Sequence, residues 1–345
     1  MKKYFLFFLL AAQSCLVMAQ KDKEPFMTKS LSNESIKNAV VQTSGGSISI
    51  TGVSASEARI EVYVYPNNSN QSGLSKEEIQ QRLSELYDLN INVTNNKLTA
   101  IAKSKEQIRD WKKALNISFK LFVPKEVSSE LTTSGGSISL VNLTGNQDFT
   151  TSGGSLHIDN LSGKTNGRTS GGSISLENSK NDIDLTTSGG SIDAKNCEGK
   201  LRLITSGGSL NLKNLKGEIR ATTSGGSIEG KTISGELITH TSGGSIHLAD
   251  ISSSLEASTS AGSITVSIKE LGKYIKINNS GGNVDLELPK NKGINLELSG
   301  TRIKTDHLES FSGKIEEDEI DGKLNGGGVP VTVKASSGKI SLVLK

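Results

Sequence analysis

A four-residue motif that returns at a constant interval is the feature that most restricts what this chain can fold into. Ser-Gly-Gly-Ser, or a close relative, starts every 18 residues without an insertion. The starts are Ser134, Ser152, Ser170, Ser188, Ser206, Ser224, Ser242 and Ser260, the last as Ser260-Ala261-Gly262-Ser263. Looser copies start at Ser44, Ser280 and Ser336. A fixed period of this kind is typical of solenoids, in which each repeat is one structural unit.

Aliphatic side chains occupy constant places within each unit. The fourth residue after the first serine is always aliphatic and the sixth usually is, whereas the residue between them varies. Such alternation predicts a strand with one buried face. A second strand is predicted from the thirteenth and fifteenth positions, as in Ile183 with Leu185 and Leu201 with Leu203. Each unit should therefore hold two short strands joined by bends that contain glycine.

One unit has too few apolar side chains to offset its ordering entropy of roughly 1–2 kcal/mol per residue. Units must stack, about 4.8 Å apart, so that equivalent residues form continuous apolar stripes. The predicted fold class is all-β, a parallel β-helix of 18 residues per coil with one short capping helix. A left-handed hexapeptide helix would need further aliphatic columns where this chain is mostly polar. We therefore expect a right-handed or otherwise non-hexad solenoid.

The predicted organisation has four parts. They are a signal peptide at 1–19, a β-rich start at 20–130 with an inserted helix near 75–88, regular coils at 131–270, and less regular coils at 271–345. The helix is predicted from the capping box that starts at Ser75 and from one apolar face. Strands are expected around it at 59–65, 89–93 and 115–123. Because an open solenoid end exposes strand edges, we interpret the helix as a cap, with a partner-binding helix as the alternative.

The N-terminus has the pattern of a secretory signal peptide. Two lysines precede an apolar run, and Val17-Met18-Ala19 supplies small residues at −3 and −1. The mature chain is then expected to begin at Gln20. A lipidated Cys15 is the alternative, although Gln13 is a poor lipobox residue and the apolar run continues past the cysteine.

Export would leave Cys197 as an unpaired cysteine, because Cys15 is removed with the signal peptide. Cys197 stands in a column otherwise filled mainly by leucine and isoleucine, so we expect it to be buried as a small apolar residue. No stretch after the signal peptide approaches the roughly 20 apolar residues of a transmembrane span.

An asparagine column marks the eighth position of the unit. It contains Asn142, Asn160, Asn178, Asn196 and Asn214, followed by Thr232 and Asp250. Stacked amides can hydrogen-bond along the axis, and asparagine tolerates the left-handed backbone of a turn. We expect a structural ladder at a bend, with a row of glycan or ice contacts as the functional alternative. The motif glycines are interpreted as adopting backbone angles that a β-carbon would disfavour.

The charge balance and the spacing of polar residues exclude several functions. With 39 Lys+Arg against 36 Asp+Glu, the net charge of +3 argues against nucleic acid as a partner. Calcium-binding β-rolls need an aspartate after Gly-Gly, where this chain has serine. Ice binding would need a regular threonine array, which Arg168, Ile204 and His240 interrupt.

A polysaccharide lyase or hydrolase is the enzymatic alternative, because such enzymes also use β-helices. Their sites gather acids and bases beneath long loops, and the coils here have no long insertions. Two outward columns hold charges that we interpret as solvated faces with opposite-charge pairs: Asp159, Glu177, Lys195, Lys213 and Lys231 in one, and Asp148, Asp184, Arg202 and Arg220 in the other. The histidines form no close motif. We therefore assign no catalytic, metal-binding or cofactor-binding residue, and we expect no cofactor.

Several motifs together resemble a known family. They are an early Gly-Ser-Ile-Ser strand, Phe122-Val123-Pro124-Lys125, the Thr-Ser-Gly-Gly-Ser-Ile-Ser-Leu coils and Leu324-Asn325-Gly326-Gly327-Gly328. With the signal peptide, they make nearly the whole mature chain similar to the bacterial putative-adhesin family of β-strand-repeat domains of unknown function (DUF4097-like). The resemblance implies a β-helical cell-surface or periplasmic protein of a Gram-negative bacterium, and it brings no catalytic residues to transfer.

The function we expect is therefore that of a non-enzymatic exported rod, an adhesin or an envelope interaction scaffold. Its expected location is periplasmic, outer-membrane-associated or extracellular. Its expected partner is a protein or glycan of the cell envelope or of a host surface. Stacking of sugars on aromatic rings is weak in the coils, because Phe149 is the only aromatic residue between Leu131 and Leu271.

Overall fold

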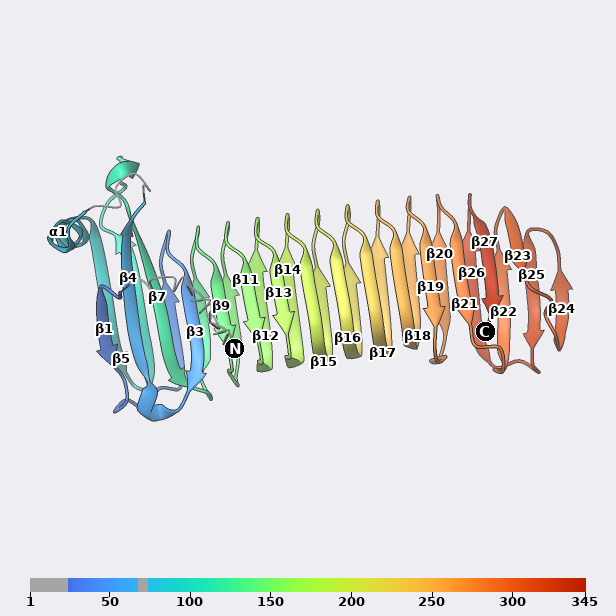
Figure 1. Ribbon diagram of the computed structural model, residues 1–345, viewed down its shortest axis with the longest axis horizontal. Helices are drawn as coiled ribbons and strands as arrows, with labels where there is room; N and C mark the ends of the chain where they lie inside the picture. The colour runs from blue at the N-terminus through green and yellow to red at the C-terminus, as the bar shows by residue number, and fades with distance from the viewer. Residues whose placement is uncertain (1–23, 68–73, 109) are drawn as a thin grey trace, which may run out of the picture.

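The computed structural model describes residues 24–67, 74–108 and 110–345, which form an elongated rod (Figure 1). Hydrogen bonds join the 27 strands of these residues into one continuous sheet, which folds into two opposed faces. Equivalent strands pair in parallel, and Ile174, Ile192 and Leu210 are successive register partners. The predicted all-β solenoid with 18-residue coils is confirmed, whereas its handedness stays a prediction. The predicted signal peptide and Cys15 lie outside the described residues.

Face A contains the strands that follow the Ser-Gly-Gly-Ser motif, together with strands of the two ends of the rod. In spatial order it holds β1 (Met27–Ser30), β4 (Arg59–Pro66), β7 (Leu115–Pro124), β3 (Ile48–Val53), β9 (Ile138–Val141), β11 (Leu156–Asp159), β13 (Ile174–Glu177), the first parts of β15 (Ile192–Ile204), β16 (Leu210–Thr222), β17 (Ile228–Thr241) and β18 (Ile246–Thr259), then β19 (Ile264–Ile268), β21 (Val284–Leu288), β27 (Lys339–Leu344) and β23 (Arg302–Thr305).

Face B contains the strands that precede the motif, together with strands of the two ends of the rod. In spatial order it holds β5 (Tyr87–Thr94), β6 (Lys97–Ser104), β2 (Asn38–Gln42), β8 (Ser128–Thr132), β10 (Gln147–Thr150), β12 (Ser162–Thr169), β14 (Lys180–Thr187), the second parts of β15 to β18, then β20 (Ile275–Asn279), β26 (Val329–Ala335), β22 (Ile294–Ser299), β25 (Glu319–Leu324) and β24 (Phe311–Ile315). Of these, β6 was not predicted from the sequence.

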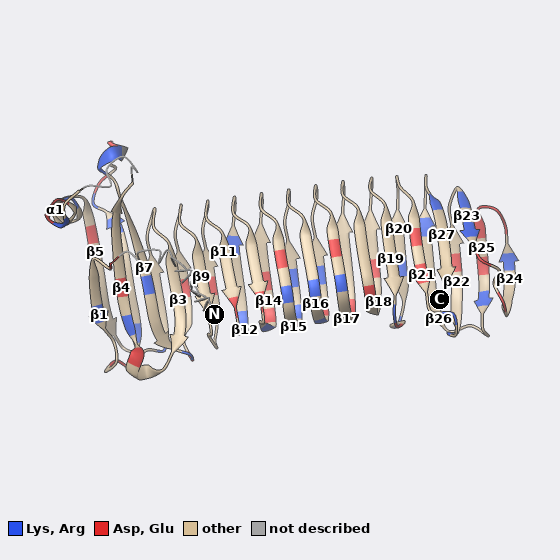
Figure 2. Cartoon of the chain, viewed as in Figure 1, with Lys and Arg blue, Asp and Glu red and all other residues tan. Residues whose placement is uncertain are grey.

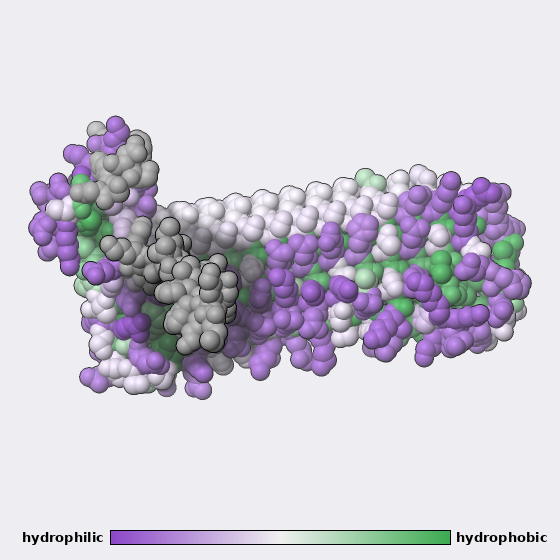
Figure 3. Space-filling model, viewed as in Figure 1, coloured by the Kyte–Doolittle hydropathy of each residue, from purple (hydrophilic) through white to green (hydrophobic). Residues whose placement is uncertain are grey.

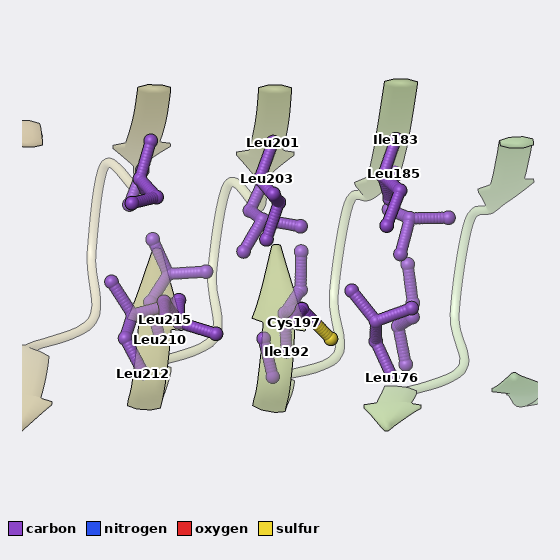
Figure 4. Close-up of a cluster of buried hydrophobic side chains, with 14 of the residues drawn as sticks. Leu176, Ile183, Leu185, Ile192, Cys197, Leu201, Leu203, Leu210, Leu212 and Leu215 are labelled. Carbon is purple, nitrogen blue, oxygen red and sulfur yellow. The ribbon is translucent and has the colours of Figure 1, made fainter. Parts of the chain in front are cut away.

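The core lies between the two faces. Residues at the predicted inward positions are almost fully buried, with Ile192 and Leu203 0% exposed and Leu201 1% exposed. Their side chains meet those of the neighbouring coils in continuous rows (Figure 4). The alternation read from the sequence therefore reports which side of each strand faces the core.

Each corner between face B and face A is closed by a buried threonine and a glycine. Thr205 Oγ1 donates a hydrogen bond of 2.7 Å to the carbonyl oxygen of Gly190 in the preceding coil. The same hydroxyl accepts a bond of 3.2 Å from the Gly208 N–H. The hydroxyl-to-carbonyl bond recurs at Thr133, Thr151, Thr169, Thr187, Thr223, Thr241 and Thr259. These corners form a ridge of near-neutral hydropathy along one edge of the rod (Figure 3).

The reason predicted for the motif glycines is wrong. The glycines with positive φ are found elsewhere, at Gly145, Gly163, Gly199, Gly217, Gly235, Gly313, Gly326 and Gly327. In the motif, it is the close approach of successive coils that excludes a side chain. A Cβ on Gly208 would lie 2.1 Å from the carbonyl oxygen of Gly190.

Both ends of the rod are built by segments that leave the sequential order of coils. Strands β2 and β3 lie inside the stack, between β6 and β8 and between β7 and β9. Strands β26 and β27 likewise lie between β20 and β22 and between β21 and β23. Antiparallel strands form the ends, with β1–β4–β7 and β5–β6 at one and β22–β25–β24 at the other. The irregular last coils were predicted, but this change of order was not.

The predicted helix is α1 (Lys76–Leu86), at the N-terminal end of the rod (Figure 1). Its capping box is formed, with the Glu78 N–H donating to Ser75 Oγ at 3.2 Å and the Ser75 N–H donating to Glu78 Oε2 at 2.9 Å. Leu83 is buried, and α1 packs against β5 and β4. The helix thus covers part of the end that the antiparallel strands form. Two short 3-10 helices, Ala55–Glu57 and Trp111–Lys113, lie in connections.

Candidate binding groove

The asparagines of the predicted ladder lie at the bend that follows face A. Their φ angles range from 51° to 58°, in the left-handed region, for Asn142, Asn160, Asn178, Asn196 and Asn214. Three neighbouring pairs share an amide hydrogen bond, with lengths of 2.7, 3.2 and 2.8 Å. Asn178 instead donates to Asp159 at 2.8 Å. Each asparagine adopts the left-handed backbone that the bend requires, and the amides link neighbouring coils. We therefore propose a structural role for the ladder.

Cys197 lies inside the core, next to this bend. It is 2% exposed, and its thiol donates to the carbonyl oxygen of Lys195 at 3.1 Å. Burial raises the pKa of the thiol to about 11. Because the thiolate is the reactive form, Cys197 is not a nucleophile at neutral pH.

Charged residues recur at similar heights on neighbouring strands of the rod (Figure 2). Neighbouring coils often carry opposite charges in the same row, as predicted. The ion pairs of this kind are Arg202–Asp184 at 2.8 Å, Lys195–Glu177 at 3.5 Å, Lys216–Glu198 at 3.0 Å and Lys276–Glu256 at 3.3 Å. Each exposed pair contributes about 0–1 kcal/mol, so these rows stabilise the stack weakly.

A shallow groove with a volume of about 580 Å³ lies on face A in the C-terminal coils. Its walls are the side chains at the fifth and seventh positions of the coils. Its floor is the backbone of the sixth-position residues Leu212, Gly230, Leu248, Val266 and Leu286. The leucine and valine side chains among them are buried in the core. The groove therefore runs along the rod axis, across β15 to β19, β21 and β27. Apolar surface between hydrophilic side chains is visible along the rod in Figure 3.

Three lysines form one wall at the start of the groove. Lys195, Lys213 and Lys231 are direct register partners on adjacent parallel strands. Lys195 Nζ has its ion pair with Glu177, whereas in the described part of the chain no carboxylate lies within ion-pair distance of Lys213 or Lys231. This half of the groove therefore holds two uncompensated ammonium groups. Because like charges directly opposite one another destabilise a sheet, these lysines do not stabilise the stack.

Groups that form hydrogen bonds occupy the facing wall. Asn211 Nδ2 donates to Asp193 Oδ1 at 2.7 Å, which leaves the side-chain oxygen Oδ1 of Asn211 as an acceptor. Glu229 and His247 follow on the next two strands, and both side chains are exposed. At the far end the groove becomes acidic, with Asp285 and Glu287, the latter 2.7 Å from Lys345 Nζ. The groove is thus polarised from basic to acidic along the rod.

Two smaller hollows lie nearby. One, of about 260 Å³, is on face B around Arg202 and Arg220, and the other, of about 370 Å³, is at the bend around Asn214. On face B, the Tyr274 hydroxyl donates to Glu236 Oε1 at 2.7 Å, and this bond raises the pKa of Tyr274 to about 12. The phenol therefore stays protonated and serves as a hydrogen-bond donor between coils.

The structure does not gather the remaining polar candidates into a reactive cluster. Within residues 24–67, 74–108 and 110–345, no three His, Cys, Asp or Glu side chains form a group that could hold a metal ion. His240 lies away from the groove, on face B, where its Nδ1 is 2.9 Å from Ser258 Oγ. No helix of the described chain is both long and apolar enough to cross a membrane.

From the sequence, Lys195, Lys213 and Lys231 are predicted to lie in a solvated charged column, and no groove is predicted. Because the fifth position varies freely, Asn211, Glu229 and His247 are not predicted to line a site. A signal was present, because three lysines follow one another in a column whose two preceding members, Asp159 and Glu177, are acids. The depth of the groove could not be inferred, since it depends on how high the two rows stand above the backbone.

Two solved structures are similar to this chain. One is described as a putative cell adhesion protein from Clostridium sporogenes ATCC 15579, with 9% identity, a TM-score of 0.21, and coverage of 92% of this chain and 98% of that one. The other is a putative adhesin from Bacteroides fragilis NCTC 9343, with 12% identity, a TM-score of 0.32, and coverage of 92% and 96%. No curated protein matches the chain significantly.

A family model matches the C-terminal part of the rod, from the second part of β17 to β27. The resemblance predicted from the sequence extended over nearly the whole mature chain, and the match covers a shorter segment that includes the acidic half of the groove. Residues 234–343 match the Toastrack DUF4097 family, and the resemblance to that family is confirmed.

Proposed function

We propose that this protein is a non-enzymatic interaction rod of the bacterial cell envelope, an adhesin or scaffold that holds an extended ligand along face A. The groove is the observation that carries this proposal. It is open, it follows the rod axis, and one set of side chains per coil forms its walls. Such a surface suits a linear partner, whose contacts are spread over many coils.

An enzymatic role as a polysaccharide lyase or hydrolase is the alternative. Catalysis needs an acid, a base or a nucleophile held against the reacting atoms. Glu229, His247 and Lys231 are exposed in the groove, and the uniform coils from Ser134 to Ser260 place no long loop over them. The groove therefore favours contact over turnover.

Incubation with envelope and host polysaccharides distinguishes the two functions. We expect bound polymer without released reducing ends or unsaturated products. Alanine at Lys195 or Lys213 should weaken attachment by less than about 1 kcal/mol each, because an exposed charge contributes little, and alanine at Asp184 or Arg202 on face B should change it even less. Turnover that disappears in Glu229→Gln or in one of those four variants would establish the enzyme instead.

Export is the second part of the proposal, and it rests on the N-terminal sequence. The mature protein should begin at Gln20, as the Val17-Met18-Ala19 pattern predicts. Mass spectrometry of protein purified from its native cells tests this prediction, and a diacylated Cys15 would contradict it. Protease shaving of intact cells then separates a periplasmic location from a cell-surface location.

A further inference from the structure

The lysine wall of the groove differs from the rows in which acids and bases alternate. Lys213 and Lys231 follow Lys195 on adjacent strands, about 4.8 Å apart, without an acid between them. Lys195, the first lysine of this wall, is neutralised by Glu177 of the preceding coil, whereas Lys213 and Lys231 have no such partner among the described residues. We propose that the basic half of the groove binds an acidic polysaccharide, a chain of hydroxylated sugars bearing carboxylates that lies along the rod axis. This inference rests on the proposed function and names the ligand class.

The facing wall indicates that the ligand carries hydroxyl groups as well as negative charge. The Glu229 carboxylate stands two residues before Lys231 on β17, and it would repel a ligand made only of anionic groups. A sugar hydroxyl, by contrast, can donate to Glu229 or to the side-chain oxygen Oδ1 of Asn211. Carboxylates on one side of a sugar chain can pair with the lysines while hydroxyls on the other side bond to this wall.

An acidic peptide fits the groove less well, for two reasons. The strands beneath the groove are already paired on both sides, so an extended peptide cannot add its backbone to the sheet. Side chains on one side of an extended peptide also repeat at about 6.6 Å, which does not match a coil spacing of about 4.8 Å. The sheet face therefore favours a sugar chain, which can bind through its hydroxyl and carboxylate groups, over a peptide, which would need to pair its backbone.

The groove lacks the aromatic platform of many sugar-binding sites. Its lining contains no Phe, Tyr or Trp among the described residues. Affinity must then come from ion pairs and hydrogen bonds that repeat from coil to coil. Such binding weakens as salt is added, because exposed charges are screened.

Calorimetric titration of the full chain with an oligogalacturonate tests the proposal. The comparison ligands are its carboxyl-reduced form and a poly-glutamate peptide of similar length. We expect the oligogalacturonate to bind, the carboxyl-reduced sugar to bind about tenfold or more weakly, and the peptide to bind weakly. Equal affinity for the acidic and the reduced sugar, or tighter binding of poly-glutamate, would overturn the assignment.

Paired variants locate the site. The double variant Lys213→Gln and Lys231→Gln should lower the affinity about tenfold, because both uncompensated charges are lost. The control, Lys164→Gln with Lys200→Gln, removes the same charge from exposed positions on face B and should leave the affinity unchanged. An equal loss in both double variants would show charge attraction without a site.

Glu229→Met distinguishes a sugar from a simple polyanion, because it removes both carboxylate acceptors together with the charge, whereas glutamine would keep one acceptor oxygen. Loss of the hydroxyl acceptors should weaken binding of the oligogalacturonate, whereas relief of repulsion would strengthen binding of poly-glutamate. Tighter sugar binding in this variant contradicts the proposal. If no acidic sugar binds while the rod still attaches to envelope preparations, the ligand class is wrong and the proposed function stands. If attachment is absent as well, the proposed function is wrong.

Discussion

Two adjacent glycines in each corner have different steric roles. A Cβ on Gly208 would lie 2.1 Å from the Gly190 carbonyl oxygen, whereas a Cβ on Gly207 would come no closer than 3.5 Å to the Ser188 carbonyl oxygen. The sequence agrees with this difference. In the coil that starts at Ser260, alanine replaces the first glycine, and the second remains as Gly262. The second glycine is therefore the one that the stacking of coils requires.

Alanine substitution at these two positions should have opposite outcomes. Gly208→Ala forces the coils apart, and we expect it to lower the free energy of unfolding by about 3 kcal/mol. Gly207→Ala adds a methyl group at ordinary van der Waals distance from its neighbours and should change that free energy by less than about 1 kcal/mol. Chemical denaturation of the two variants measures both values. Similar losses in the two proteins would contradict the close-approach explanation.

The buried thiol of Cys197 predicts a pH dependence of stability. Its pKa is raised from the ordinary value of 9.0 to about 11, so between these pH values the unfolded chain binds fewer protons than the folded one. The free energy of unfolding should therefore fall as the pH rises through this window, by about 2 kcal/mol at pH 11. Denaturation at several pH values gives the slope.

Cys197→Leu is the matched control, because leucine fills this column in other coils. The raised pKa of Tyr274 acts equally in both proteins and cancels in the comparison. The variant should lose the part of the alkaline decline that Cys197 causes. Parallel pH curves for the two proteins would show that the thiol does not contribute.

At the scale of the element, each corner depends on hydrogen bonds that the strands do not supply. Thr223 is 1% exposed, and its Oγ1 donates to the Gly208 carbonyl oxygen at 2.8 Å and accepts from the Gly226 N–H at 3.3 Å. In the coil that starts at Ser280, Asn279 takes the threonine's place, and its Nδ2 donates to the Gly262 carbonyl oxygen at 2.9 Å. A polar side chain is thus retained where the residue type changes.

Removal of one corner hydroxyl should be costly. Thr223→Val keeps the shape but leaves a buried carbonyl oxygen unsatisfied, so we expect a loss of about 1–3 kcal/mol in the free energy of unfolding. The neighbouring half-buried Thr222 has no side-chain hydrogen bond to another described residue, so Thr222→Val should be nearly neutral. Equal denaturation midpoints for the two variants would argue against a role for the hydroxyl.

At the scale of the whole molecule, the period of the sequence predicted the coils but not their order in the stack. The alternation around Ile48 and Ile50 identifies a buried strand face, and it would suit any place in the stack equally well. The strand that contains them, β3, pairs with β7 and β9. This pairing depends on differences between nearly equivalent coils, which the alternation does not show. The groove could not be predicted for a related reason. It forms because the fifth-position and seventh-position side chains of several stacked coils extend above the backbone between them.

The rod is a stack of 18-residue coils, and we expect these coils to be interchangeable and their outer surface to make the contacts. Deletion of residues 188–205 removes one whole coil and would bring Asp184 opposite Arg220 and Glu177 opposite Lys213, which are favourable pairs. Deletion of residues 188–196 removes half a coil and would shift inward residues out of register with their neighbours.

Small-angle X-ray scattering of these two deletion variants, with denaturation and attachment measured on the same samples, tests whether the coils are interchangeable. We expect the whole-coil deletion to give a folded rod shorter by about 4.8 Å, and the half-coil deletion to unfold or aggregate. Attachment of the shortened rod should be weakened but retained. Equal tolerance of the two deletions would show that the rod is not a stack of 18-residue units.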